Sequence, residues 1–330
     1  MDTVMPKQED IRHSCTILLP LYNGSKFLSQ SLNNLCEIAG PTDEILVLDD
    51  GSTDLTNQEI DSLDKLDPRI VFHKFEHRGL VSTLNEGIRL AKNEFIARAD
   101  VDDTYAKNRI EMQVNYLIDN PETSAVFSDY KMVSSSGKNL GTFPSAISTE
   151  LTAFSLLCSQ RTPHPSVMYR KSAVVAAGGY MPQDFPAEDL ALWIRLVSKG
   201  KIASIPFVLL NYTVHGASIT QTKQKLMREK SHALRQQYAW SINAKDLLNH
   251  SAKLLDGYSE NTFRDLRTLF FFEELLKYDQ LTNGINRQKI TSILFKQILK
   301  RNFFLVPPLL YAIFMKLKRK SLNSKLFSTR

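Results

Sequence analysis

Short apolar runs alternate with helix-like segments over the first hundred residues, and this alternation is the strongest constraint on the fold. The pattern consists of apolar runs at residues 14–21, 44–48, 69–75 and 94–99 and of helical spacing at residues 26–35 and 80–91. Strands that alternate with helices form βαβ units, whose strands lie parallel in one sheet. The sequence therefore predicts an α/β fold with a mostly parallel sheet flanked by helices.

The pattern becomes mixed after residue 108. We predict helices at residues 108–120, 149–160 and 188–199, two strands within 125–143, and strands at 166–169 and at 202–213 with a break at Pro206. From about residue 223 the sequence is long, polar and rich in helical spacing. We therefore expect an α/β domain over residues 1–221 and a helical, basic C-terminal region over residues 222–330.

The excess of basic over acidic residues lies entirely at the C-terminal end of the chain. The net charge is +6, yet residues 281–330 contain 11 Lys and Arg and no Asp or Glu. The first 280 residues therefore hold 30 basic and 35 acidic residues, a net charge of −5. A uniformly basic nucleic-acid-binding protein would not show this distribution, so we expect no nucleic acid partner.

The cysteines and the N-terminus indicate a cytoplasmic location. Cys15, Cys36 and Cys158 are odd in number and lie in no CxxC or His/Cys cluster. We interpret them as small buried hydrophobic residues rather than as disulfide or zinc partners. Residues 1–13 are polar and contain no apolar signal segment, and no run reaches the about 20 apolar residues that span a bilayer.

Three carboxylates follow the apolar run at 94–99. Asp100, Asp102 and Asp103 repel one another unless solvent or a hard cation offsets their charge. In parallel sheets ligands bind beyond the carboxyl ends of the strands, where these residues fall. Two interpretations remain, a solvated acidic turn and a site for a divalent ion, Mn²⁺ or Mg²⁺.

Two further acidic pairs each allow two interpretations. Asp49 and Asp50 follow the apolar run at 44–48, where they can accept hydrogen bonds from a base or ribose or simply form a turn and a helix cap. Glu188 and Asp189 open a predicted helix. Acids there are stabilised by the helix dipole, and one of them can also serve as general base for an acceptor hydroxyl.

Four segments resemble the family 2 glycosyltransferases, which have the Rossmann-like GT-A fold. They are TILLPLYN (16–23), EILVLDDGSTD (44–54), IARADVDD (96–103) and AEDLALWIR (187–195), with HPSVMYR (164–170) and GGY (178–180) also similar. The resemblance runs in the family's order from about residue 15 to residue 220. It implies an inverting transfer of sugar from a nucleotide-diphosphate sugar, a UDP-sugar, to a hydroxyl of a glycan or lipid-linked acceptor in surface polysaccharide biosynthesis.

The resemblance also implies roles for the donor site. Pro20, Tyr22 and Asn23 would line the nucleotide base, and Asp50 would accept a hydrogen bond from it. Asp100 would meet the ribose or the sugar.

Further roles concern the metal, the acceptor and the diphosphate. The resemblance implies that Asp102 binds the metal with Asp103 as a further member, that Asp189 is the catalytic base, and that Glu188 lies near the acceptor or donor sugar. His215 lies in a segment, residues 212–218, that in the family closes over the diphosphate, and we assign it as a further metal ligand.

Two of these roles have plain alternatives. Thr213 stands where the family usually has Arg, which weakens a phosphate contact there, and His215 can also be an ordinary loop histidine. Arg78 follows the third predicted strand, where it can meet the diphosphate or remain a surface arginine.

An uncharged apolar run lies near the C-terminus. FFLVPPLLYAIFM (303–315) has 13 residues, preceded by Lys300 and Arg301 and followed by four basic residues within 316–320. We predict that residues 300–320 bind an anionic membrane surface, which would make the protein peripheral on the inner face of the cell membrane. The alternative is a core segment of the C-terminal region.

Two other functions compete with glycosyl transfer. A non-catalytic nucleotide-sugar-binding module would retain the pocket without turnover, and the presence of Asp189 and of the acidic run 100–103 argues against it. A sugar-nucleotide nucleotidyltransferase would need a Gly-rich phosphate loop near the first strand. Residues 23–26 (NGSK) hold a single glycine.

Overall fold

The computed structural model describes residues 13–54, 56, 60, 67–145, 156, 162–216 and 222–241, and the structural statements below concern these residues. The chain divides into two compact units, Met1–Lys245 and Asp246–Arg330, and every described residue belongs to the first. This unit extends past the predicted domain end at 221. The division into a domain over 1–221 and a helical basic region over 222–330 stays a prediction.

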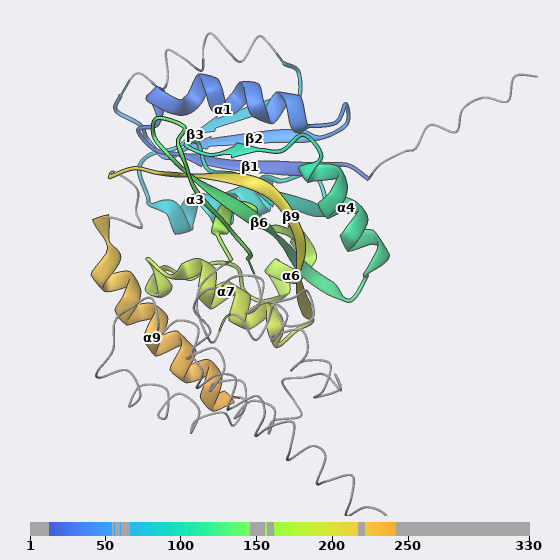
Figure 1. Ribbon diagram of the computed structural model, residues 1–330, viewed down its shortest axis with the longest axis vertical. Coiled ribbons are helices and arrows are strands. Elements are labelled where there is room, and N and C mark those ends of the chain that lie inside the picture. Colours follow the sequence, from blue (N-terminus) through green and yellow to red (C-terminus); the bar gives the residue numbers. More distant parts are fainter. Residues whose placement is uncertain are drawn as a thin grey trace, which may run out of the picture. The chain divides into compact units, whose positions relative to one another are not determined.

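A single nine-stranded sheet forms the centre of the fold (Figure 1). Its strands are β1 (Cys15–Leu21), β2 (Glu44–Asp49), β3 (Ile70–Lys74), β4 (Phe95–Arg98), β5 (Thr104–Tyr105), β6 (Thr123–Ser134), β7 (Asn139–Phe143), β8 (Met168–Arg170) and β9 (Lys201–Val214). Their order is β3-β2-β1-β4-β8-β6-β9-β5, with β7 paired to β6. The first four strands of this order are parallel, as is the pair β6–β9, which confirms the predicted α/β fold.

Helices cover both faces of the sheet. They are α1 (Ser25–Ile38), α3 (Leu80–Leu90), α4 (Arg109–Asp119), α6 (Lys171–Ala176), α7 (Glu188–Val197) and α9 (Gln224–Ser241), with short 3₁₀ turns at His164–Ser166 and Pro182–Asp184. Figure 1 shows α1 on one side of the sheet and α3, α6 and α7 on the other.

The two faces of β1 belong to two separate hydrophobic cores. Ile17 and Leu19 pack with apolar residues of α1 and α4, whereas Leu18, between them, packs with those of α3 and α7. Successive side chains of a strand point to opposite faces, so an uninterrupted apolar run such as residues 15–21 fits a strand that is covered on both sides.

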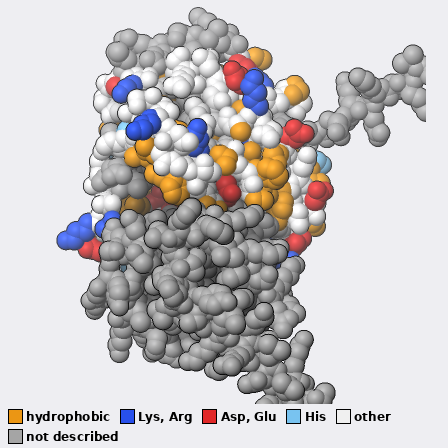
Figure 2. All heavy atoms as spheres, viewed as in Figure 1, with side chains coloured by type: hydrophobic (Ala, Val, Ile, Leu, Met, Phe, Trp, Pro, Cys, Tyr) orange, Lys and Arg blue, Asp and Glu red, His pale blue; other side chains and the backbone are white. Residues whose placement is uncertain are grey.

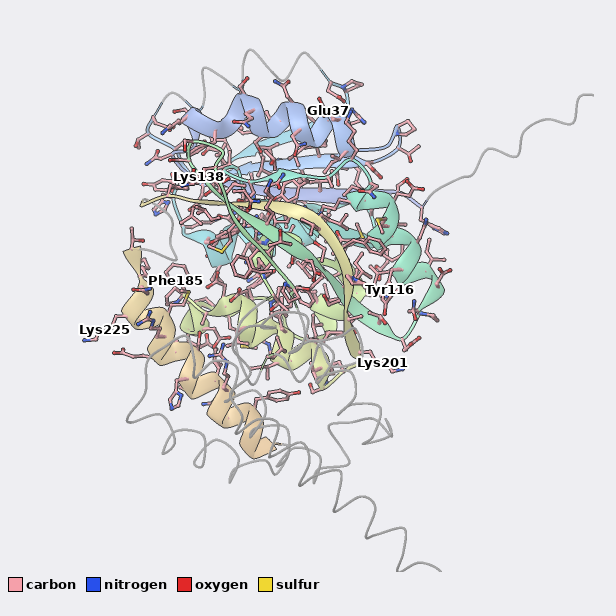
Figure 3. All side chains as sticks on the ribbon, viewed as in Figure 1. Glu37, Tyr116, Lys138, Phe185, Lys201 and Lys225 are labelled. Carbon is pink, nitrogen blue, oxygen red and sulfur yellow. The ribbon has the colours of Figure 1, made fainter. Side chains whose placement is uncertain are left out.

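Helix α9 packs against the layer that contains α7. Leu234 contacts the core on that face of the sheet. Figure 3 shows Phe185 close to the N-terminal end of α9, and Nζ of Lys223 lies 5.4 Å from the centre of its ring. Nζ of Lys230 donates to the carbonyl of Gln183. The described part of α9 therefore belongs to the same unit as the sheet.

One strand prediction needs correction. The expected break at Pro206 is wrong, because β9 runs without interruption from Lys201 to Val214. Its register against β6 slips instead, since Ser128 pairs with Ile205 and Asp129 with Val208. Proline lacks the N–H that the ladder needs, and a local bulge accommodates it.

Several apolar side chains of this part of the sheet lie on the surface. Figure 2 shows apolar side chains exposed over the face that carries β6 and β9. Phe207 is 50% exposed and Val208 42% exposed, and Leu140 of β7 is also exposed.

Other predictions meet the limits of the described residues. The helix at 149–160 lies outside them except for Leu156, and so do Cys158 and the apolar run at 303–315. Cys15 is buried as predicted, whereas Cys36 is only partly buried. Among the described helices, none is long and apolar enough to cross a bilayer.

Candidate functional site

The three carboxylates that follow β4 lie together at the carboxyl edge of the sheet. One oxygen from each of Asp100, Asp102 and Asp103 can be chosen so that all lie within 4.8 Å of one another. Strand β4 is parallel to β1, so it delivers these residues to the edge at which β1 and β2 also end. The short strand β5, immediately after the acidic turn, pairs with β9 and fixes the turn from its other side.

Asp103 is the buried member of this group. It is 2% exposed, its Oδ1 accepts a hydrogen bond from the backbone N–H of Thr213 at 2.7 Å, and its Oδ2 has no partner among the described residues. Burial raises the pKa of Asp103 well above its usual value, and the charges of Asp100 and Asp102 raise it further. A hard cation would offset this repulsion and satisfy the orphaned oxygen, so the donor set fits Mg²⁺ or Mn²⁺.

The end of β9 brings a histidine to the same place. Nε2 of His215 lies 2.6 Å from Oδ2 of Asp102, and its ring centre lies 5.3 Å from that of Phe27 in α1. The pairing of β5 with β9 carries this segment to the acidic turn. The structure thus joins the predicted residues Asp102, Asp103 and His215 in one cluster.

Asp50 holds the loop between β3 and α3. Its Oδ1 accepts hydrogen bonds from the backbone N–H of Arg78 at 3.0 Å and from the hydroxyl of Thr83 at 2.9 Å. Its Oδ2 accepts one from the N–H of Gly79 at 3.0 Å and lies 2.9 Å from Nδ1 of His77. Asp50 is 3% exposed. The structural role of Asp50 is to hold the loop between β3 and α3. Its contact with a nucleotide base stays a prediction.

An aromatic pair lies next to this loop. The rings of Tyr22 and His77 stack with their centres 4.2 Å apart, and Tyr22 is 48% exposed. Asn23, at a positive φ of 52°, accepts a hydrogen bond at Oδ1 from the N–H of Thr53 at 2.8 Å and so joins the loops after β1 and β2. Pro20 is buried within β1. These loops place an exposed aromatic face beside the acidic edge of the sheet.

The start of α7 presents two acids with different surroundings. Glu188 is 6% exposed and its Oε2 has no partner among the described residues, whereas Asp189 is half-buried and its Oδ1 accepts the N–H of Leu190 at 2.7 Å. Burial raises the pKa of Glu188 to about 8, with the charge of Asp189 adding to it. The charge of Asp100 raises this pKa too, so α7 begins within electrostatic reach of the acidic turn.

Comparison with known proteins decides the family. The model described as Glycosyl transferase family 2 matches residues 16–173. An uncharacterized glycosyltransferase of Haemophilus influenzae is 30% identical over 217 residues, which cover 63% of this chain and 79% of that protein. The chain belongs to the family 2 glycosyltransferases.

Other relatives of this glycosyltransferase carry more specific names. A putative teichuronic acid biosynthesis glycosyltransferase of Bacillus subtilis, TuaG, is 26% identical over 65% of this chain and 84% of that protein. The structure of S. aureus TarS 1–349 in complex with UDP-GlcNAc matches 91% of this chain and 83% of that one, with a TM-score of 0.55 and 16% identity. The mannosyltransferase PcManGT of Pyrobaculum calidifontis, in complex with GDP-Man and Mn²⁺, matches 87% of each chain with a TM-score of 0.51 and 16% identity. These structures share the GT-A-like fold of this glycosyltransferase.

Two residues of the glycosyltransferase were not foreseen from its sequence. His77, which stacks on Tyr22, and Arg98, which pairs with Asp100 at 2.5 Å, carry no local signal beyond their position near a strand end. The guanidinium of Arg78 lies 4.1 Å from the centre of the Phe75 ring at the surface, so its role toward a diphosphate stays a prediction.

Proposed function

We propose that this glycosyltransferase moves a sugar from a nucleotide-diphosphate sugar, of the UDP class, onto a hydroxyl of a glycan or lipid-linked acceptor. The carrying observation is the cluster of Asp100, Asp102, Asp103 and His215 at the carboxyl edge of the parallel sheet. Such an edge is where α/β folds bind ligands, and carboxylates are suited to a divalent ion that itself contacts diphosphate. The nucleotide and nucleotide-sugar complexes of TarS and PcManGT support this donor class.

The donor would lie across the loops that follow β1, β2 and β3. Pro20, Tyr22 and Asn23 would line the base, and Asp50 would keep the β3–α3 loop in place while accepting a hydrogen bond from the base. Asp100 would contact the ribose or the sugar. A carboxylate offers about four lone-pair sites, and Asp50 already makes four contacts, so a hydrogen bond from the base would replace one of them.

A divalent ion, Mn²⁺ or Mg²⁺, would be held by Asp102 with His215 and Asp103. When bound, the ion supplies positive charge that offsets the charge of the leaving diphosphate. The exposed guanidinium of Arg78 would add to this on the side of the β3–α3 loop. The Mn²⁺ in the PcManGT complex supports a metal here.

Asp189 would act as general base. It is half-buried at the first turn of α7, where it would take the proton of the acceptor hydroxyl as that oxygen attacks the anomeric carbon. One direct displacement of the nucleoside diphosphate inverts that carbon. Glu188, buried beside Asp189, would lie near the acceptor or donor sugar, and its raised pKa would keep it protonated near neutral pH.

The biological setting follows from the acceptor class. We place the enzyme in surface polysaccharide biosynthesis, in the cytoplasm and bound peripherally to the inner membrane face through residues 300–320, with the catalytic domain at 1–221. The name of the B. subtilis relative supports the pathway class. The basic residues that flank the apolar run support the membrane contact.

The test is a screen of nucleotide-sugars with product analysis. A bound donor raises the midpoint of thermal unfolding, and the best donor is then incubated with Mn²⁺ and glycan or lipid-linked acceptors. Glycosylated product with equimolar UDP supports the proposal. Release of pyrophosphate would indicate a nucleotidyltransferase, and binding of a nucleotide-sugar without turnover on any acceptor would indicate a binding module.

A further inference from the structure

A buried arginine lies directly behind the acidic turn. Arg98, the last residue of β4, is 2% exposed, and its Nη2 lies 2.5 Å from Oδ1 of Asp100. Its Nη1 donates to the carbonyl of Ala99, and its Nε has no hydrogen-bond partner among the described residues. The guanidinium is thus a permanent cation, shielded from solvent, that contacts the first carboxylate of the turn.

Arg98 and Asp100 are both held in place by their surroundings. The N–H of Arg98 donates to the carbonyl of Val167 at 3.0 Å, and its carbonyl accepts from Nη2 of Arg109 at 2.7 Å. Arg109 is fully buried, with its guanidinium 4.2 Å from the centre of the Tyr105 ring. The hydroxyl of Tyr105 in turn accepts the N–H of Asp100 at 2.8 Å. Asp100 is therefore fixed at its backbone as well as at its carboxylate.

Stability alone does not account for a buried guanidinium at this point. Removing a cation from water is costly, and well-packed apolar side chains often replace buried ion pairs without loss of stability. Three carboxylates with oxygens within 4.8 Å of one another repel each other, however, and positive charge nearby stabilises their ionised form. Arg98 supplies that charge to Asp100 by direct contact, and in the described part of the chain no arginine forms an ion pair with Asp102 or Asp103.

We infer that Arg98 is a positioning residue for donor binding in this enzyme, an inference that rests on the proposed function. By engaging Oδ1 of Asp100, it presents Oδ2 of the same carboxylate to the donor in a single orientation. It also offsets the negative charge of Asp100, so that a nucleoside diphosphate with its divalent ion approaches a less repulsive edge of the sheet. A residue with this role acts through Asp100, the carboxylate of the acidic turn with which it forms an ion pair.

A double-mutant cycle tests this dependence. Binding of Mn²⁺ alone and of UDP in the presence of Mn²⁺ is measured by calorimetry on the full chain, on Arg98→Met, on Asp100→Asn and on the double variant. We expect Arg98→Met to weaken UDP binding by roughly tenfold when Asp100 is present and to have no further effect when it is combined with Asp100→Asn. Arg98→Lys keeps the positive charge but lacks the planar guanidinium with its several N–H donors, so this variant should lose less UDP affinity than Arg98→Met.

Two results would overturn the inference. One is a loss of affinity on Arg98→Met that is the same with Asp100 intact as in the Asp100→Asn background, which indicates a purely structural arginine. The other is unchanged UDP binding in Asp100→Asn, since Arg98 then has nothing to position. If Arg98→Met does not fold, the cycle is run with Arg98→Lys and judged by the same two criteria.

Controls separate this inference from the proposed function. Arg89→Met removes an exposed arginine that is paired with Glu86 on α3, and it should leave UDP binding unchanged. Wild-type protein that binds UDP with Mn²⁺ yet releases no UDP from any nucleotide-sugar would reject glycosyl transfer. The coupling between Arg98 and Asp100 would still be measured by the same titrations.

Discussion

Nε2 of His215 lies 2.6 Å from Oδ2 of Asp102, although the two residues are 113 positions apart in the chain. The contact forms where β9 ends against the acidic turn, because β5 pairs Thr104 with Asn211 and Tyr105 with Leu210. It brings an imidazole nitrogen to the carboxylate that we propose as the principal metal ligand.

His215→Ala should weaken the response to the divalent ion. Whether His215 binds the ion directly or orients Asp102, loss of such a partner typically costs about 10–100-fold in metal affinity. The concentration of Mn²⁺ that gives half-maximal transfer should therefore rise by about that factor. His13→Ala, in a histidine outside the site, is the control, and an unchanged Mn²⁺ dependence of His215→Ala would make His215 an ordinary loop residue.

Activity should require a divalent ion, and Asp102→Asn should lose most donor binding and most turnover. The reason is that three carboxylates share one strand end and one buried oxygen of Asp103 has no partner among the described residues. Transfer is measured with and without excess EDTA, and Asp119→Asn at the exposed end of α4 serves as the matched control. Full activity in EDTA would exclude the metal site.

Asp189→Asn should retain donor affinity and lose transfer. A general base contributes about 10²–10⁴-fold to the rate, so the turnover number should fall by a factor in that range. The affinity for UDP is measured in parallel to show that the donor site is intact. A fall of less than tenfold in a folded variant would leave Asp189 as a helix-capping acid, and the base would lie elsewhere.

Glu188 should make stability depend on pH. Its pKa is about 8 in the folded protein and near 4.5 when exposed, so between these values the native state holds a proton that the unfolded state has released. The protonated Glu188 therefore contributes to the free energy of unfolding. Its contribution is fully present below about pH 4.5 and is lost as the pH rises to about 8, at a slope of up to about 1.4 kcal/mol per pH unit.

Glu188→Gln removes this titration, so the variant should gain stability relative to the wild type as pH rises from 5 to 8, with little further change above pH 9. Chemical denaturation at a series of pH values gives the difference curve. Glu111→Gln changes an exposed acid in the first turn of α4 and should leave the pH slope of the wild type. The same slope in Glu188→Gln as in the wild type would show that Glu188 is ionised in the folded protein.

Residues 300–320 should bind an anionic membrane surface without crossing it. The uncharged run has 13 residues, short of the about 20 that span a bilayer, and Pro307 and Pro308 interrupt it. Each basic residue near an anionic surface contributes about 1 kcal/mol, so anionic vesicles should pellet the protein at low salt. Deletion of residues 300–330 should release a folded protein that still binds UDP.

Residues 300–320 lie outside the described residues. Two outcomes of the vesicle assay would contradict membrane binding. Full-length protein that stays in the supernatant would reject membrane binding. A deletion that unfolds the protein would instead favour the alternative, in which residues 303–315 are a core segment. Neutral vesicles at the same lipid concentration distinguish charge attraction from apolar insertion.

The sequence by itself determined the local architecture and the kind of chemistry. Uninterrupted apolar runs at residues 14–21 and 44–48 specified strands covered on both faces, and these became β1 and β2 within one residue of each end. The acidic turn after β4 was equally visible, because its residues are neighbours in the chain. The spacing of apolar residues and the adjacency of the acidic residues are local properties of the chain, so both can be recognised without knowledge of the fold.

Tertiary structure decided which distant residues meet and which become buried. The pairing of β5 with β9 joins His215 to Asp102, and the loop after β3 stacks His77 on Tyr22. No pattern in the sequence distinguishes the buried Glu188 from its half-buried neighbour Asp189. Burial in the folded protein is nevertheless the largest cause of the raised pKa of Glu188. Strand pairing and desolvation depend on packing between segments that are remote in the chain. The spacing of apolar residues within one segment therefore does not predict them.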